Sequence, residues 1–343
     1  MPGCGKKGAL VISLDFELHW GVRDHTPLDS AERKRLLAAR AVVPEILRLF
    51  REHNIRATWA TVGLLFARSR DEAEECRPQR LPKYDRVELN PYHETIGRDE
   101  SNDPFHFAPS LIRQVADQAG QEIGSHSYSH YYPLEAGQCA VDFDSDLASA
   151  TLIAKQSGYS LKSYVFPRNQ VSRSYLPILS RGGFSSYRGT ELATSKAPVT
   201  FNGQRRPWKR AVRLMDAYWN LHGAQTVEWP LGDNPVPVNA SRYLRPYSSA
   251  LRALEAARLR RIAGAMTEAA VKGKLFHLWW HPEDFAHETK RNLDFLNRVL
   301  VVFECHRRQY DMASLSMGDV SEGAKSAVGV VNATLEIAVR SVA

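Results

Sequence analysis

The order of apolar and polar residues divides the chain into alternating strands and helices. Residues 9–16 are mostly apolar and β-branched, which is typical of a strand buried on both faces. Residues 31–53 follow with apolar side chains three and four positions apart, a spacing that predicts an amphipathic helix. After a short turn at Asn54, residues 57–62 predict a second strand.

The same alternation continues to about residue 314. Further helices are predicted over residues 111–119, 143–158, 175–182, 252–272 and 290–306, and further strands at 122–125, 163–166, near 184, at 274–280 and at 311–314. This order predicts an α/β fold in which helices surround a parallel sheet. We assign residues 1–320 to this single domain and residues 321–343 to a helical tail without an assigned function.

Two long segments, residues 68–107 and 188–245, interrupt the alternation. Both are rich in proline, arginine and aromatic residues. Long loops of this kind commonly shape a binding site. The alternative is that these insertions only pack against the rest of the domain.

Composition and charge limit the function classes. The chain has 45 basic and 38 acidic residues, a formal net charge of +7, which suits a sugar linked to a nucleotide or a lipid phosphate as well as an ordinary basic surface. Basic residues are not interleaved with aromatic ones as a nucleic-acid groove requires. No apolar stretch approaches the ~20 residues of a membrane-spanning helix. Oligomeric state is left open.

The cysteines and the N-terminal residues indicate the cellular compartment of the protein. The four cysteines are scattered and form no Cys-x-x-Cys pair, so they indicate free thiols in a reducing environment. The apolar run after Lys6 and Lys7 is short and is followed by acidic residues, which favours a core strand over a signal peptide. We therefore expect a cytoplasmic protein that is made without cleavage.

Four polar segments follow predicted strands, at the end where parallel barrels carry their active sites. In the first, Asp15 and Glu17 are two residues apart and point to the same side of a strand. Two such carboxylates repel each other unless a cation or a proton lies between them, the alternative being an ion pair with arginine or lysine. In the second, His126 and His130 have a spacing that brings both rings to one metal on a helical turn, although such pairs also arise by chance.

The other two segments each offer one candidate. Arg168 follows Pro167 after a strand and could hold a carboxylate through two hydrogen bonds, unless it lies in a surface turn. His281 ends a very apolar strand. It is either a core histidine or a proton donor that faces the site.

Together these segments resemble the polysaccharide deacetylase superfamily, also called carbohydrate esterase family 4. The resemblance runs in order over residues 10–314, with His-Ser-Tyr-Ser-His at 126–130 as its most specific motif. Leu-Asp-Phe-Glu at 14–17 and Leu-Trp-Trp-His-Pro at 278–282 are similar to a subgroup often associated with surface-polysaccharide biosynthesis. The resemblance implies a distorted (β/α) barrel of about seven strands and cleavage of an amide on an acetylated amino sugar.

The resemblance also implies a role for each candidate residue. Asp15 would be the catalytic base, His281 the general acid, and Arg168 the residue that orients Asp15. A divalent metal, zinc first and Co²⁺, Ni²⁺ or Fe²⁺ as alternatives, would be held by three ligands. These ligands would be Glu17, His126 and His130.

Two departures from the family pattern keep alternatives open. Phe16 separates two acidic residues that are usually adjacent, which leaves open whether Asp15 or Glu17 binds the metal. Pro167 precedes Arg168 instead of following it, which leaves the partner of the arginine open.

The sequence therefore predicts a carbohydrate N-deacetylase that acts on a small-molecule, nucleotide-linked or lipid-linked sugar, a precursor of a cell-surface polysaccharide. One alternative is a hydrolase of a cyclic amide or ureide on the same fold. Another is a carbohydrate-binding protein that has lost its activity.

Overall fold

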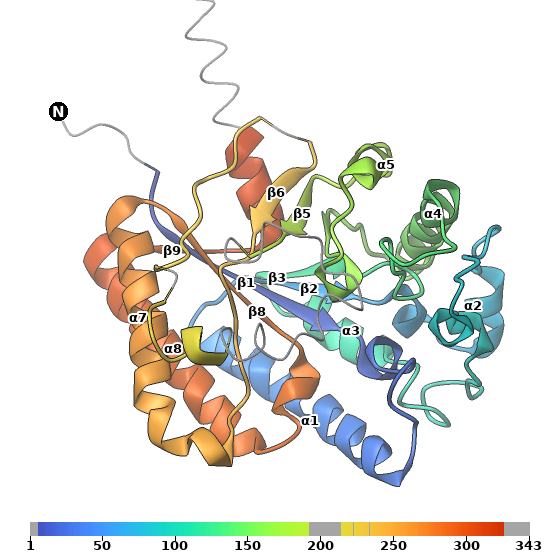
Figure 1. Ribbon diagram of the computed structural model, residues 1–343, viewed down its shortest axis with the longest axis horizontal. Coiled ribbons are helices and arrows are strands. Elements are labelled where there is room, and N and C mark those ends of the chain that lie inside the picture. The colour runs from blue at the N-terminus through green and yellow to red at the C-terminus, as the bar shows by residue number, and fades with distance from the viewer. Residues whose placement is uncertain (1–5, 192–213, 222, 233, 326–343) are drawn as a thin grey trace, which may run out of the picture.

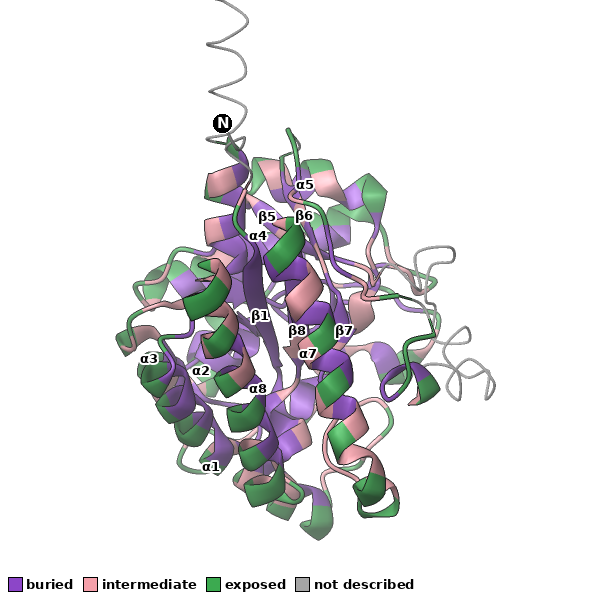
Figure 2. Ribbon diagram, turned by 90° about the vertical axis from the view of Figure 1, so that its left-hand side faces the viewer, coloured by how far each residue is buried: buried purple, intermediate pink, exposed green. Residues whose placement is uncertain are grey.

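The computed structural model describes residues 6–191, 214–221, 223–232 and 234–325. Its central strand, β1 (Ala9–Phe16), is buried along all eight residues (Figure 2). Alternate residues of β1 face opposite sides because side chains in a strand point up and down in turn. Leu10, Ile12 and Leu14 belong to the large core under the helices, whereas Ala9 and Val11 belong to a second cluster with residues of other strands. Asp15 continues the face of Ala9 and Val11.

The strands form one parallel sheet in the order β6-β5-β4-β3-β2-β1-β8-β7, and β9 pairs with β1 off this path. Every pairing is parallel, which confirms the predicted α/β fold and agrees with a distorted barrel. The other strands are β2 (Ala57–Thr61), β3 (Gln121–Ser125), β4 (Ser163–Tyr164), β5 (Ser186–Gly189), β6 (Val236–Asn239), β7 (Arg242–Tyr243), β8 (Leu275–Trp280) and β9 (Ala313–Leu315).

The sheet has eight strands on its path where the sequence predicted about seven. The difference arises in residues 236–243, where β6 pairs with β5 and β7 pairs with β8. Between these strands, Ala240 N–H donates to Gly189 O of β5, and Ser241 N–H donates to His277 O of β8. One bent segment of the second predicted insertion thus joins the two edges of the sheet. That insertion is part of the barrel and is not only decoration.

The helices surround the sheet (Figure 1). The predicted helices are confirmed with small changes at their ends. The first long helix begins after Asp29, whose side chain caps it by accepting a hydrogen bond from Glu32 N–H. The helices are α1 (Ser30–Glu52), α2 (Arg70–Glu75), α3 (Pro109–Asp117), α4 (Ala140–Gln156), α5 (Leu176–Arg181), α7 (Glu255–Lys272) and α8 (Thr289–Tyr310). None of the helices in the described residues is long and apolar enough to cross a membrane.

Two sequence predictions fall partly outside the described residues. Residues 317–325 are helical, so this helix begins before the predicted start of the tail at residue 321. The rest of the tail, 326–343, lies outside the described residues, as does 192–213 within the second insertion.

Candidate active site

Two histidines and a glutamate meet where β1 and β3 end. Glu17 follows β1, and its Oε2 lies 3.2 Å from His126 Nε2 and 3.0 Å from His130 Nε2. All three side chains are buried. The sequence prediction placed these residues at one metal, and the structure brings them together.

The loop that carries the histidines is not the helical turn that the sequence predicted. Ser127 and His130 both have positive φ, 63° and 57°, a conformation that is unfavourable for residues other than glycine. The carboxylate of Asp146, on α4, accepts hydrogen bonds from Tyr128 N–H at 2.7 Å and Ser129 N–H at 3.1 Å. These bonds hold the strained turn in place, and the turn aims both rings at Glu17.

Hydrogen bonds at Nδ1 fix the orientation of both rings. His126 Nδ1 lies 2.9 Å from Val165 O, and His130 Nδ1 lies 3.1 Å from the hydroxyl of Tyr132. A proton on each Nδ1 leaves the lone pair of Nε2 to face Glu17, as in metal-binding histidines. Burial lowers the pKa of His130 to about 4, so its imidazole is neutral at pH 7.

The donor set suits a divalent metal. His126 Nε2 is buried and makes no hydrogen bond, which leaves a lone pair without a donor. A tetrahedral zinc with bonds of about 2.0–2.1 Å separates its ligand atoms by about 3.3–3.4 Å, close to the distances between Glu17 and the two rings. Two imidazoles and one carboxylate also match the ligand types that zinc and its neighbours accept. The residues present therefore fit the metal that the resemblance implied.

Backbone contacts fix the position of Glu17. The next residue, Leu18, has a φ of 46°, and its N–H donates to Glu283 Oε1 at 2.6 Å. Glu283 lies in the short helix after β8, so the ends of β1 and β8 are tied together. Burial would raise the pKa of Glu17, but the charge of His281 and contacts with His126 and His130 hold it well below its usual value.

Asp15 is held by Arg188 of β5, which corrects the prediction that Arg168 orients it. Arg188 Nη1 and Nη2 donate to the two carboxylate oxygens of Asp15 at 2.5 and 2.6 Å. The arginine is fully buried, and Asn169 Oδ1 and Ser13 Oγ accept its other hydrogen bonds. Burial would raise the pKa of Asp15, but the charge and hydrogen bonds of Arg188 lower it below its usual value.

Arg168 has a different partner because of the backbone in its loop. Arg168 and Asn169 have φ angles of 54° and 52°. Arg168 Nη2 donates to both oxygens of Asp24, at 2.7 and 2.6 Å, and its guanidinium stacks over the ring of Tyr132. Tyr132 contacts His130, so Arg168 belongs to the surroundings of the histidine pair.

His281 lies between the two carboxylates. Its Nε2 is 3.8 Å from Asp15 Oδ2 and 3.6 Å from Glu17 Oε1, and its Nδ1 is 3.1 Å from Asp284 Oδ2. Burial lowers its pKa, but the charges of Glu17, Asp284 and Asp15 outweigh this and raise it well above its usual value. This direction favours the protonated imidazolium at pH 7, and the side chain is 28 % exposed, so it reaches solvent.

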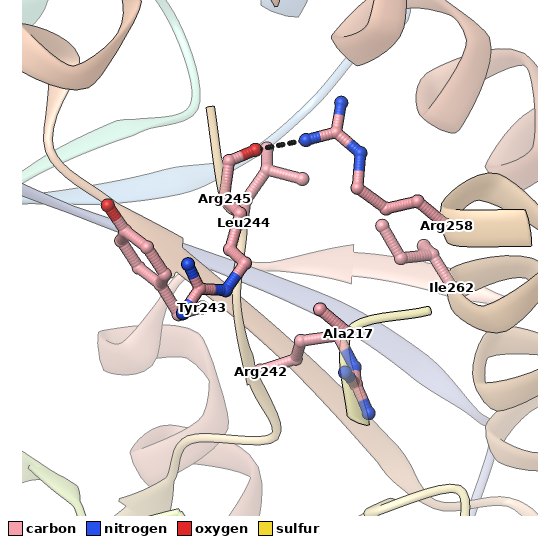
Figure 3. Close-up of a pocket in the computed structure, with 7 residues that line it drawn as sticks. All are labelled: Ala217, Arg242, Tyr243, Leu244, Arg245, Arg258 and Ile262. Atoms are coloured by element: carbon pink, nitrogen blue, oxygen red, sulfur yellow. Dashed lines mark hydrogen bonds between the residues drawn. The ribbon is translucent and has the colours of Figure 1, made fainter. Parts of the chain in front are cut away.

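A small cavity between β7 and α7 is not a second substrate site. Its volume is about 10 Å³, and Arg258 closes one side by donating to the backbone oxygen of Arg245 (Figure 3). A space of this size holds at most one water molecule.

Sequence reasoning missed several residues of the site. Arg188 lies in the short polar strand Ser-Tyr-Arg-Gly, at the start of the predicted second insertion, and its only signal is its place just after the strand predicted near residue 184. Asp284 stands three residues after His281, a spacing at which a carboxylate can reach the ring. Asp24, Tyr132 and Asp146 reach the site from loops and a helix whose paths the sequence pattern does not specify.

The fold is a parallel α/β barrel, and the ends of its strands carry the polar groups of the candidate site. This arrangement is typical of a hydrolase. The family model of polysaccharide deacetylase matches residues 29–187, which include His126 and His130. Residues 29–187, a little under half of the chain, therefore match a polysaccharide deacetylase domain. Asp15, Glu17 and His281 lie outside the matched residues and join them through the fold.

Solved structures share this fold. A protein from Mycobacterium smegmatis described as a polysaccharide deacetylase has a TM-score of 0.58 at 14 % identity, over 95 % of this chain and 93 % of its own. One from Pseudomonas aeruginosa PAO1 with the same description has a TM-score of 0.53 at 12 % identity, over 92 % and 89 %. An allantoinase has a TM-score of 0.50 at 13 % identity, over 94 % and 91 %. Among curated proteins, none is significantly similar in sequence.

Proposed function

We propose that this protein is a metal-dependent hydrolase that removes an N-acyl group, acetyl in the simplest case, from an amino sugar. The observation that carries the proposal is that His281 Nε2 lies within 4 Å of two carboxylates, one clamped by Arg188 and one in contact with two histidines. A base, an acid and a metal-ligand set thus lie within reach of one scissile bond.

Glu17, His126 and His130 would hold the metal, with zinc as the first candidate. When bound, the metal supplies Lewis-acid chemistry for hydrolysis at neutral pH. The sequence left open which of the two separated acidic residues binds the metal. We assign Glu17 to the metal and Asp15 to proton transfer.

Asp15 is suited to be the general base. Its low pKa keeps it ionised, and Arg188 occupies only one lone pair on each of its oxygens. The remaining lone pairs can accept the proton of an attacking water. Arg188 prevents rotation of the carboxylate, so the base is already oriented when substrate arrives.

His281 is suited to be the general acid. Amide cleavage needs a proton on the departing nitrogen, because an amide anion is too basic to leave. The imidazolium of His281 carries that proton, and Asp284 holds Nδ1 so that Nε2 faces the site. Its partial exposure lets the ring meet a substrate that enters from solvent.

The proposed substrate class is supported by the family model that matches the chain. Its description names polysaccharides, and the net charge of +7 suits a sugar on an anionic carrier. That the sugar is a nucleotide-linked or lipid-linked precursor of a cell-surface polysaccharide, handled in the cytoplasm, stays a prediction from the sequence.

Mass spectrometry can test the proposal with purified, zinc-loaded or cobalt-loaded full-length protein. The substrates are N-acetylglucosamine oligomers, a nucleotide-linked N-acetyl amino sugar and a cyclic ureide, each with the Asp15→Asn variant as control. Release of acetate and a free amine by the wild type, and not by the variant, supports the proposal. Opening of the ureide ring alone favours the alternative hydrolase. If the metal-loaded protein hydrolyses none of the sugars, the proposal is contradicted.

A further inference from the structure

A second pair of histidines meets a glutamate outside the candidate active site. The first insertion, between α2 and α3, returns to the segment that follows β1. There, His19 N–H donates to Phe105 O at 3.3 Å, and Trp20 Nε1 donates to His106 O at 3.0 Å. These contacts place the rings of His19 and His106 edge to face, with centroids 5.1 Å apart.

Glu94, from the same insertion, completes the group. Its Oε1 lies 3.7 Å from His19 Nε2 and 3.6 Å from His106 Nε2. Both histidines are 1 % exposed, and one ligand atom from each of the three residues lies within 4.8 Å of the others. The two glutamate–histidine separations are slightly wider than the about 3.3–3.4 Å between ligands of a tetrahedral zinc. For these two pairs, a cation would need to shorten the separation by only a few tenths of an ångström.

His106 is oriented as metal-binding histidines are. Its Nδ1 lies 2.8 Å from Asp103 Oδ2, and Asp103 is itself fixed by Gly97 N–H at 2.7 Å. A carboxylate on Nδ1 sets the tautomer and makes Nε2 a better ligand. That Nε2 is buried and has no hydrogen-bond partner. The unpartnered atom faces Glu94 and is the second, independent sign of a ligand.

We propose that His19, Glu94 and His106 form a second divalent-metal site of the zinc class. The cation would link the first insertion to the residue two positions after Glu17, and so brace the segment that carries the metal-binding carboxylate. The site is separate from the proposed catalytic centre, with which it shares no residue.

The same residues could instead form an ion cluster without a metal. Burial lowers the pKa of His106, but the hydrogen bond with Asp103 and the nearby carboxylate of Glu94 raise it above its usual value, so a proton could take the place of the cation. The charge of Glu32 raises the pKa of His19, and the charge of Arg23 lowers it. The two arrangements differ in metal content, which can be measured directly.

The experiment counts Co²⁺ and Zn²⁺ bound to full-length protein after desalting, and follows the visible absorption of Co²⁺. In a Glu17→Gln, His126→Ala double variant, which lacks the catalytic ligands, we expect about one equivalent to remain. Adding His106→Ala should remove it. His93→Ala, an exposed histidine beside Glu94, is the matched control and should keep it. Because the double variant has no catalytic metal set, the result does not depend on the proposed hydrolase activity.

Two further measurements guard against variants that fail to fold. In the otherwise wild-type chain, Glu94→Gln should lower the metal content from about two equivalents to about one. Asp103→Asn should keep the ligands and weaken the affinity of the second site about 10–100-fold. A double variant that holds no metal while it is folded, or equal losses from His106→Ala and His93→Ala, would each overturn the proposal.

Discussion

The two sides of the candidate active site hold their functional groups in different ways. On the base side, Asp15 and Arg188 form a bidentate ion pair from which solvent is excluded on both partners. On the metal side, His130 is neutral and is held by the hydroxyl of Tyr132, behind which Arg168 pairs with Asp24. One side is thus built from charges in direct contact, and the other from histidine rings in a hydrogen-bonded frame.

This difference shows what each side contributes. A buried charge that loses its partner is costly, so the base side combines catalysis with stability. Histidine rings held by single hydrogen bonds can be reoriented at a smaller cost, so the metal side should respond mainly through metal affinity. Variants on the two sides should therefore fail in different assays.

The largest effects are expected where each side reaches the substrate. Asp15→Asn should keep most of the metal and lose activity 10²–10⁴-fold, because an amide cannot accept a proton from water. Glu17→Gln should lose the metal together with activity, because an anionic ligand becomes neutral. Metal analysis and kcat/KM of both variants, with His126→Ala as the metal-free control, measure this. If Asp15→Asn is the metal-free protein, the roles of the two carboxylates are exchanged.

His281, which contacts both sides, should be nearly as sensitive. His281→Gln should lower kcat about 10²–10⁴-fold with little change in KM, since a general acid acts mainly in the transition state. Its metal content should stay at the wild-type level. Steady-state kinetics on the true substrate measures this effect. An unchanged turnover would mean that His281 has only a structural role.

Arg188→Met should unfold more easily than the wild type by about 3–5 kcal/mol, because it leaves the Asp15 carboxylate buried without a cation. The Asp15→Asn, Arg188→Met double variant is the control, and its loss should be smaller than that of Arg188→Met alone. Urea unfolding of the wild type and of both variants measures the losses. Equal losses in Arg188→Met and the double variant would mean that packing, and not the ion pair, sets the cost.

On the metal side, Tyr132→Phe should weaken zinc affinity about 10–100-fold, because it removes the acceptor that orients His130. Competition with a chelator of known affinity measures the change. Tyr131→Phe removes a neighbouring hydroxyl that bonds Gln138 and should leave zinc affinity unchanged. Comparable losses in the two variants would argue against a role for the Tyr132 hydroxyl.

The smallest expected effect is a change in pH dependence. The carboxylate of Asp284 stabilises the imidazolium of His281, so Asp284→Asn should lower the pKa of that ring. The acid form is then lost at a lower pH, and the alkaline limb of the kcat profile should move to lower pH. Tyr243→Phe, which removes only the hydroxyl bonded to Asp284, keeps the charge and should move the limb less. If the alkaline limb does not move in Asp284→Asn, a group other than His281 is responsible for it.

Local sequence patterns determined most of the framework. The apolar run of β1 and the periodic pattern of α1 predicted both elements to within a residue, because burial on both faces or on one face leaves a short-range signature. The same logic predicted the three candidate metal ligands, since carboxyl ends of parallel strands meet at one edge. Glu17, His126 and His130 needed only the strand assignments to be brought together.

Tertiary structure alone decided which distant groups became partners. β6 and β7 have four and two residues, too few to carry a period, and only their pairing with β5 and β8 shows that they join the sheet. Arg188 reaches Asp15 because β5 lies across the barrel from β1, while left-handed backbone at Arg168 accompanies its pairing with Asp24. His19 and His106 meet through the path of an insertion. These contacts depend on the register and closure of the whole barrel, which side-chain order along the chain does not encode locally.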